Sequence, residues 1–173
     1  MNKVRVVITG IGAITPIGTG KEAYWEALSQ GRSGISEITS FDTSEFSNHR
    51  GGEVRDFYPK KYIDTSKLGK IGRASQYAIA TTKMALEDAG IEIDGSFKER
   101  IGISLGTTMG ETQVLEQIDR VWAKSGDEVV ESSWIAQLPT NLLASNPAFE
   151  FGLKGPVMLL PAACAAGNYA IGY

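Results

Sequence analysis

Cys164 is the only cysteine in this 173-residue chain, and it stands in the segment LLPAACAAGNYAIG, residues 159–172. The apolar residues before it predict a short strand, the alanines a tight turn, and the residues after it the start of a helix. Such a turn exposes the cysteine, surrounds it with side chains small enough to admit a bulky thioester, and places it near the positive end of a helix, which favours the thiolate. Free cysteines are more often small core residues. The surroundings nevertheless favour Cys164 as a nucleophile.

The other polar residues indicate no second site. A single cysteine excludes a disulfide within the chain, and with His49 as the only histidine a zinc site built from Cys and His is excluded too. His49 lies in a polar, irregular stretch and is predicted to be a surface residue. Glu111 and the acid-rich residues 126–133 are interpreted as solvated faces. Asn141 and Asn146 are interpreted as turn or cap residues.

Gly10 and Gly12 follow an apolar run, as in a dinucleotide-binding loop. That fingerprint needs a third glycine where Thr15 stands, and a helix that opens at the glycines to meet the pyrophosphate. Pro16 follows Thr15 at once. We therefore expect these glycines to let the first loop cross closely over its neighbours, and a nucleotide-binding α/β module is the least favoured alternative.

Strand-like and helix-like segments alternate along the chain, which predicts a layered α/β fold with a mainly parallel sheet. The helix over 72–89 has an alanine-rich packing face and is predicted to be buried, and the one over 111–124 carries Val114, Leu115, Ile118, Val121 and Trp122 on one face. Residues 31–65 are expected to be irregular. The predicted strands are 3–9, which is expected to be covered on both faces, 100–108 and the run before Cys164. The predicted helices are 22–30, 72–89, 111–124, 141–152 and the start of one after Cys164. Thr19 and Thr140 are the predicted caps of the first and fourth of these helices, Gly31 and Gly90 are the predicted ends of the first and second, and Pro147 lies inside the fourth or at a break in it.

Composition narrows the class of protein. Lys and Arg number 17 against 20 Asp and Glu, and the basic residues are scattered, so a nucleic-acid partner is not expected. No apolar run approaches the roughly 20 residues that cross a bilayer. The start, MNKVRVVITG, does not have the pattern of a signal peptide. The chain is predicted to be cytoplasmic and not bound to membranes.

Five segments together resemble the β-ketoacyl-[acyl carrier protein] synthases, condensing enzymes of the thiolase-like fold. They are VVITGIGAITPIG, WEALSQGRSGI, RIGISLGTTMG, LPTNLLASNPAFEFGLKGP and GPVMLLPAACAAGNYAIGY, and the resemblance covers nearly all 173 residues. It implies that residues 1–173 are the N-terminal domain of such a synthase, an incomplete N-terminal half of the fold that ends just after the active-site cysteine. The discrete synthases look closer than the ketosynthase domains of large modular enzymes.

The resemblance implies an acyltransferase that forms 3-oxoacyl-[acyl carrier protein] in fatty-acid or polyketide biosynthesis. Cys164 would carry the acyl chain, with its backbone N–H as half of an oxyanion hole. Malonyl carrier protein would supply the second carbon unit by decarboxylation, so neither cofactor nor metal is implied. Acyl carrier protein bearing acyl and malonyl groups is the implied partner, and a homodimer the implied assembly.

This sequence departs from the family in two ways. Ala162, preceded by Pro161, stands where the family commonly has Thr or Ser, which removes a hydroxyl beneath the nucleophile. The two histidines that polarise the thioester carbonyl lie well downstream of the cysteine in the family, whereas His49 lies upstream of it. The second hypothesis is therefore a catalytically incompetent fragment, or a half-protein that needs a downstream polypeptide.

Overall fold

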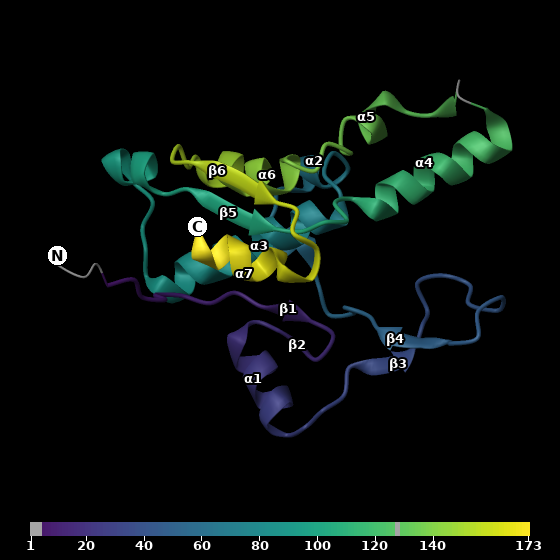
Figure 1. Cartoon of the computed structure of the whole chain (residues 1–173), viewed down its shortest axis with the longest axis horizontal. Helices are drawn as coiled ribbons and strands as arrows, with labels where there is room; N and C mark the ends of the chain where they lie inside the picture. Colours follow the sequence, from purple (N-terminus) through teal and green to yellow (C-terminus); the bar gives the residue numbers. More distant parts are fainter. Residues whose placement is uncertain (1–4, 127–128) are drawn as a thin grey trace. The chain divides into compact units, whose positions relative to one another are not determined.

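The computed structural model describes residues 5–126 and 129–173 (Figure 1). The chain divides into two compact units. The first comprises Met1–Tyr58 and Thr81–Ile91, and the second comprises Pro59–Ala80 and Glu92–Tyr173. In the described ranges no helix is long and apolar enough to cross a membrane.

The first unit is built from short hairpins and helices. Strand β1 pairs antiparallel with β2, and β3 pairs antiparallel with β4 across the stretch expected to be irregular. Elsewhere residues 31–58 are largely loops and turns, as predicted. The elements are β1 (Ile14–Thr15), β2 (Gly18–Thr19), α1 (Lys21–Ser29), β3 (Ile35–Glu37), β4 (Arg50–Gly52) and residues 81–89 of α3 (Arg73–Ala89).

The strand predicted over residues 3–9 is not formed where the structure describes it. Residues 5–9 have no regular secondary structure, and residues 3 and 4 lie outside the described ranges. Val6 is 92% exposed, and Val7 and Ile8 are also exposed, so the expected cover on both faces is absent as well. β-branched residues favour a strand, but a strand also needs a partner for its backbone hydrogen bonds. None of the described strands pairs with this segment.

Helix α1 forms where predicted, but its start differs from the prediction. The N-cap is Gly20 with φ 91°, and no side chain caps the helix. Thr19 was the predicted cap; it lies instead in β2, and its hydroxyl donates to the carbonyl of Asp56 at 3.4 Å. The predicted end is confirmed, because Gly31 has φ 66° and the N–H groups of Gly31 and Arg32 close the last turn.

The glycines of the first loop lie against the backbone of α3, as expected from their spacing. A Cβ at Gly10 would stand 2.1 Å from the carbonyl oxygen of Ala85, and one at Gly12 would stand 2.1 Å from that of Thr81. Only hydrogen can occupy such a space. The backbone N–H of Ile11 also donates to the carboxylate of Asp88 at 2.9 Å, which fastens the loop to the helix.

The second unit contains the remaining helices and the one parallel strand pair of the described chain. Its elements are η1 (Pro59–Lys61), α2 (Thr65–Leu68), residues 73–80 of α3, η2 (Gly95–Arg100), β5 (Ile103–Gly106), α4 (Thr112–Ser125), α5 (Ser132–Ile135), α6 (Leu142–Phe151), β6 (Val157–Leu160), η4 (Ala163–Ala165) and α7 (Ala166–Gly172). Figure 1 shows β5 and β6 side by side, with α6 and α7 flanking them.

Strands β5 and β6 run parallel with Ile103 opposite Val157 and Gly106 opposite Leu160. The strand predicted over 100–108 is confirmed in a shorter form. Just before the two strands, the backbone at Gly102 lies close to that at Pro156: a Cβ at Gly102 would stand 2.3 Å from the carbonyl oxygen of Pro156. The mixed α/β class is as predicted, although two of the three small sheets in the described chain are antiparallel.

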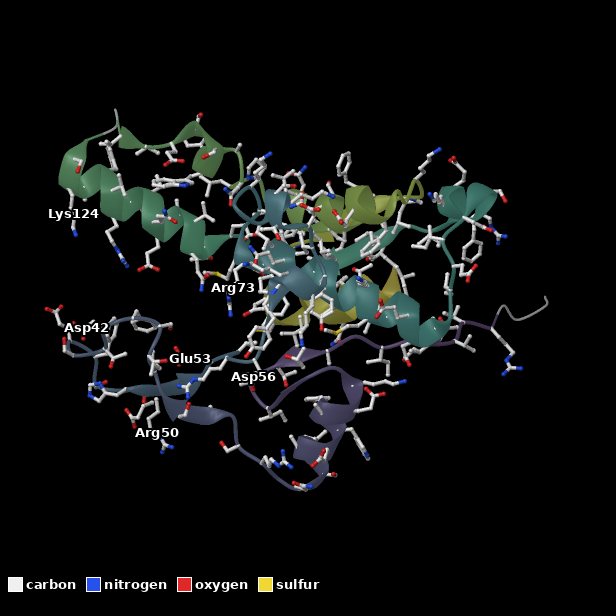
Figure 2. The ribbon with its side chains drawn as sticks, turned by 180° about the vertical axis from the view of Figure 1, so that it is seen from behind. Asp42, Arg50, Glu53, Asp56, Arg73 and Lys124 are labelled. Carbon is white, nitrogen blue, oxygen red and sulfur yellow. The ribbon has the colours of Figure 1, made fainter. Side chains whose placement is uncertain are left out.

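Helices α3 and α4 form close to the predicted ranges, but they differ in how much of their surface is buried. Helix α3 ends at Gly90, which has φ 62°, and within the second unit it buries Ser75, Ile79 and Ala80. Helix α4 is amphipathic as predicted, but of its residues only Val114 is buried, and Trp122 is 60% exposed. Figure 2 shows the last turn of α4 at Lys124. The apolar face of α4 is therefore mostly exposed.

Helix α6 contains Pro147, as one of the two predicted arrangements required. The N-cap is Asn141 rather than Thr140, and no side chain caps the helix. Asn141 is thus a cap residue by position, as interpreted. Gly152 ends the helix with φ 64°. Pro147 is buried, so its ring contributes to packing while its missing N–H costs the helix one bond.

Candidate active site

Cys164 lies in a tight turn between β6 and α7, and its side chain is exposed. Pro161 has no N–H and follows the last residue of β6, so the ladder stops there. The N–H of Ala162 donates to the carbonyl of Leu160 at 3.1 Å, and the N–H of Ala165 donates to that of Ala162 at 3.1 Å. The predicted order of strand, tight turn and helix is confirmed. Cys164 is within the short 3-10 turn Ala163–Ala165 that leads into α7.

Ala163, the residue before Cys164, has φ 47°. No other non-glycine residue in the described ranges has a positive φ. An L-residue with a side chain pays about 1–2 kcal/mol for this left-handed conformation. Conformations of this kind persist where the surrounding structure holds them, and they concentrate at functional sites. The small alanine side chains let the chain turn within two residues.

The end of β5 lies directly beneath the start of α7. A Cβ at Gly106 would stand 2.1 Å from the carbonyl oxygen of Ala166 and 2.8 Å from the nitrogen of Gly167. Ala166 is the first residue of α7 and is only 3% exposed. Because parallel strands end at the same edge, the loop after β5, residues 107–111, emerges beside the turn that carries Cys164.

Glu111 ends this loop and is buried, at 4% exposed, which contradicts its interpretation as part of a solvated face. Its carboxylate accepts the backbone N–H of Ser75 at 2.7 Å and that of Ala74 at 3.0 Å. These are orphan donors of the first turn of α3, where a negative charge is favourable. A Cβ at Gly72 would stand 2.2 Å from the same carboxylate. Of the acid-rich stretch 126–133, Glu131 is exposed as predicted, and residues 127 and 128 lie outside the described ranges.

Asn146 is not a turn or cap residue, because it lies inside α6. Its side-chain amide donates to the hydroxyl of Ser75 at 2.9 Å. Ser75 therefore connects Glu111 and Asn146, and all three residues belong to the second unit. The sequence gives no local signal for this network, because Glu111 and Asn146 lie 36 and 71 residues after Ser75.

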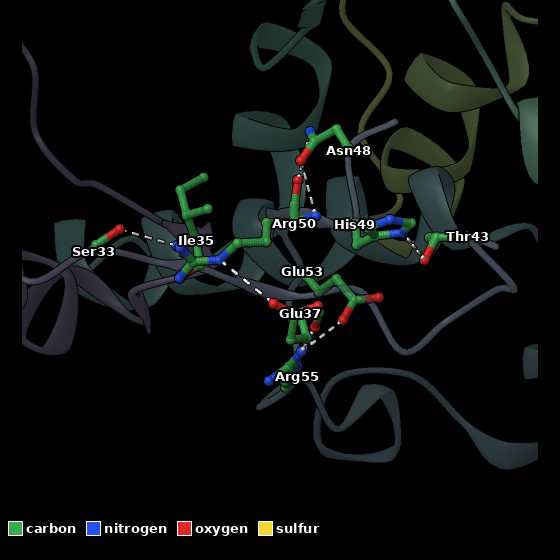
Figure 3. A network of polar contacts seen from close by, with 9 residues as sticks. All are labelled: Ser33, Ile35, Glu37, Thr43, Asn48, His49, Arg50, Glu53 and Arg55. Carbon is green, nitrogen blue, oxygen red and sulfur yellow. Dashed lines mark hydrogen bonds and ion pairs between the residues drawn. The ribbon is translucent and has the colours of Figure 1, made fainter. Parts of the chain in front are cut away.

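His49 is an exposed residue of the first unit, as predicted. Its Nδ1 lies 3.1 Å from the hydroxyl of Thr43, next to the polar contacts of β3 and β4 (Figure 3). In the same network Glu53 accepts the N–H groups of Thr39 and Ser40. Hydrogen bonds from Ser40 and then Arg55 hold the pKa of Glu53 well below its ordinary value. These contacts fasten the loop to the β3–β4 hairpin.

The first loop does not have the geometry of a nucleotide-binding loop. After Gly12 the chain enters the β1–β2 hairpin and not a helix N-terminus. The N–H of Ile11, which a phosphate would need, is bonded to Asp88. Within the ranges that the structure describes, no three His, Cys, Asp or Glu side chains are placed to hold a metal ion.

A polar pocket of about 230 Å³ lies beside the start of α3. Its lining includes Arg73, Gln113, Gln117, Trp134 and Gln137, and it does not include Cys164. Figure 2 marks Arg73, whose guanidinium lies over the ring of Tyr77.

The family model described as the N-terminal domain of β-ketoacyl synthases matches residues 3–173. This chain belongs to the β-ketoacyl synthase family. The predicted resemblance is thereby confirmed. A curated relative, 3-oxoacyl-[acyl-carrier-protein] synthase 2 of Synechocystis sp., is 36% identical over 172 residues, 99% of this chain and 41% of the relative.

Solved ketosynthases share the fold. The structure described as the ishigamide ketosynthase/chain length factor is 36% identical with a TM-score of 0.86, and the match covers 96% of this chain and 42% of that one. A type II polyketide ketosynthase, solved in complex with its acyl-carrier protein and bound to a hexaketide, is 25% identical with a TM-score of 0.77; the match covers 96% of this chain and 44% of that one. The predicted thiolase-like α/β fold is thus confirmed. The chain spans about two fifths of the length of the relatives it matches.

Proposed function

We propose that this chain is the cysteine-bearing N-terminal portion of a β-ketoacyl-[acyl carrier protein] synthase, and that Cys164 accepts the acyl chain. The observation that carries the proposal is the exposed thiol in the strained turn between β6 and α7. A nucleophile needs access to its substrate and a fixed position, and this turn supplies both. Membership of the family supports the proposal, since its curated relatives are named 3-oxoacyl-[acyl-carrier-protein] synthases.

In the first step, the Cys164 thiolate attacks the carbonyl carbon of an acyl thioester on acyl carrier protein. A new bond forms between Sγ and the acyl carbon, the bond from that carbon to the carrier's sulfur breaks, and the carrier leaves as a thiolate that takes a proton from water. Division of the reaction through a covalent acyl-enzyme replaces one difficult step by two easier ones. The backbone N–H of Cys164 would donate to the oxyanion of the tetrahedral intermediate.

In the second step, malonyl carrier protein loses carbon dioxide and the resulting carbanion attacks the acyl carbon on Cys164. The carbon–carbon bond forms while the bond to Sγ breaks, which restores the thiolate and releases 3-oxoacyl carrier protein. The electron pair comes from the carbon–carbon bond that joined the malonyl methylene carbon to the lost carboxylate, so no external oxidant or reductant is needed. The family resemblance assigns polarisation of the carbonyl to histidines downstream of the cysteine, and His49 does not match them.

The partners follow from this chemistry. Acyl carrier protein delivers both substrates, and a solved complex of a related ketosynthase with its acyl-carrier protein supports this partner. A homodimer in the cytoplasm is the assembly and location that we propose for the complete enzyme. Both the fatty-acid and polyketide pathways are compatible with the proposal, because named relatives come from each.

A second candidate is that these 173 residues perform the acylation but cannot complete the condensation without a further polypeptide. The chain spans 41% of its curated relative, and large apolar side chains such as Phe149 and Ile171 are exposed in the second unit. Exposed apolar surface of this kind commonly marks an interaction site. The two candidates differ only in the second step, so the half-reactions must be measured separately.

The test incubates the chain with an acyl thioester of acyl carrier protein and measures its intact mass. Because the chain has one cysteine, a single acyl adduct that hydroxylamine removes would report Cys164. Malonyl carrier protein is then added, and 3-oxoacyl product is measured. Product formation supports the complete reaction, whereas an adduct without product supports the second candidate.

Cys164→Ala is the decisive variant, and Cys164→Ser is its conservative control with a weaker nucleophile. We expect no adduct on the alanine variant. An unchanged adduct, or malonyl-dependent condensation that survives Cys164→Ala, would contradict the assignment of Cys164. No adduct on the unaltered chain would contradict both candidates.

A further inference from the structure

We propose that Gly106 is a positioning residue for Cys164. By lacking a side chain, it lets the first turn of α7 rest on the end of β5, and this contact sets where the thiol stands. The inference rests on the proposed function, in which Cys164 is the acyl acceptor. It adds a residue 58 positions earlier in the chain that acts only through backbone packing.

The contact between Gly106 and α7 is made by backbone atoms alone. A Cβ at position 106 would stand 2.1 Å from the carbonyl oxygen of Ala166, 2.3 Å from its carbonyl carbon and 2.8 Å from the nitrogen of Gly167. A rotamer change cannot relieve such an overlap, because the obstructing atoms belong to the main chain. The strand end and the helix would have to separate.

Hydrogen bonds connect the first residue of α7 to the residues that flank Cys164. The N–H of Ala166 donates to the carbonyl of Ala163, and the N–H of Ala165 donates to that of Ala162. Cys164 lies inside this bonded turn, two residues before Ala166. Ala163, at φ 47°, lies in a narrow allowed region of backbone conformation, so the turn has little freedom to absorb a shift. A shift of the first turn of α7 is therefore transmitted to Cys164.

The size of the shift follows from contact distances. Carbon and oxygen in ordinary contact stand about 3.4 Å or more apart, so the 2.1 Å approach must open by roughly 1 Å. A misplacement of about 1 Å in a reacting group can slow an enzymatic step by about 100-fold, because the bound geometry no longer approaches the transition state. Exposure of the thiol is not removed by such a shift.

Two other glycines provide matched controls. Gly102 begins the approach to the same strand at its opposite end, where a Cβ would stand 2.3 Å from the carbonyl oxygen of Pro156. Gly102→Ala therefore makes a comparable backbone collision away from α7. Gly167 follows Ala166 in α7, and a Cβ there would meet nothing within 4 Å. Gly167→Ala adds the same methyl group to the helix without the collision.

The experiment compares two reactions of the same thiol in the unaltered chain, Gly106→Ala and the two controls. One is acyl transfer from the acyl carrier protein thioester, which needs a positioned nucleophile. The other is alkylation by iodoacetamide, which needs only an accessible thiolate. For Gly106→Ala we expect acyl transfer about 100-fold slower and alkylation within about threefold of the unaltered rate. Both controls should retain the unaltered ratio of the two rates, although Gly102→Ala should unfold at a lower temperature.

Equal acyl-transfer rates for Gly106→Ala and the unaltered chain would overturn the role of Gly106 and leave the proposed function intact. So would an equal loss of both rates in Gly106→Ala and Gly102→Ala, since that is a general structural effect. Absence of acyl transfer to the unaltered chain would overturn the proposed function and this role with it. If Gly106→Ala does not fold, Ala166→Val enlarges a buried side chain in the same turn of α7, and a selective loss of acyl transfer is expected there too. An unchanged ratio in Ala166→Val would then overturn the role.

Discussion

Removal of the negative charge of Glu111 should destabilise the second unit, because this buried carboxylate caps α3 from a distant loop. Its two oxygens accept the N–H groups of Ala74 and Ser75 at 3.0 and 2.7 Å. A hydrogen bond to a charged group contributes about 1.5–3 kcal/mol, and a buried donor left without a partner costs about 1–3 kcal/mol. Glu111→Ala leaves two such donors, so we expect a loss of about 3–4 kcal/mol in the free energy of unfolding.

Glu111→Gln preserves the shape of the side chain but only one acceptor oxygen. Its amide would present N–H groups to a backbone N–H, so we expect about 2 kcal/mol of destabilisation. The control is Glu116→Gln on neighbouring α4. That carboxylate is exposed and pairs with Arg120 one turn on, so the change should cost less than about 0.5 kcal/mol.

Urea unfolding followed by far-ultraviolet circular dichroism measures these differences, with the slope of free energy against urea compared between variants. The order of loss should be Glu111→Ala, then Glu111→Gln, then Glu116→Gln. If Glu111→Gln is no less stable than Glu116→Gln, the carboxylate does not cap α3 and the reasoning is wrong.

Two further predictions concern the first loop and its contacts. Gly12→Ala should lower the free energy of unfolding by about 2 kcal/mol, because its Cβ would meet the carbonyl of Thr81. The control is Gly69→Ala, in open space at φ −76°, which should leave the free energy of unfolding unchanged or raise it by up to about 1 kcal/mol. Urea unfolding of both variants measures the two differences. The hydrogen bond from Lys21, followed by that from the N–H of Ile11, lowers the pKa of Asp88 below its ordinary value of 3.8. A lowered pKa in the folded state contributes stability that is complete above pH 3.8 and disappears as the pH falls through the folded value. Asp88→Asn should therefore be less stable than the unaltered chain at neutral pH and equally stable in strong acid, and a gap that does not close in acid would count against this pairing.

Local sequence signals predicted most helices and the turn at Cys164. Gly31, Gly90 and Gly152 end helices because a left-handed residue closes the last turn, and this property belongs to the glycine itself. The turn at Cys164 follows from Pro161 and the run of alanines, which restrict the backbone directly. Such features depend on neighbours along the chain, and a sequence shows those neighbours.

Features that depend on distant residues were missed or wrong. Val6 to Ile8 have strand-forming side chains, but whether they pair depends on another strand. Thr19 and Thr140 are suitable caps by type, yet in each helix the N-cap is the next residue along the chain, Gly20 or Asn141. Glu111 and Asn146 looked like surface or turn residues because their partners on α3 are 36 and 71 positions away.

The candidate site could be predicted only in part for the same reason. The exposed turn at Cys164 could be predicted from its neighbours, whereas Gly106 looks like an ordinary strand end until the helix above it is placed. Glycines at both ends of the strand, Gly102 just before it and Gly106 as its last residue, were the available signal that other backbone lies close to both ends of β5.

The bare segment from Val6 to Ile8 bears on how this chain behaves in concentrated solution. Its amides and carbonyls are presented beside apolar side chains, without a neighbouring strand in the described chain. Segments of this kind template pairing between molecules, and that association is at least second order in protein. Refolding yield should therefore fall as the protein concentration rises, even when each molecule folds correctly in dilution.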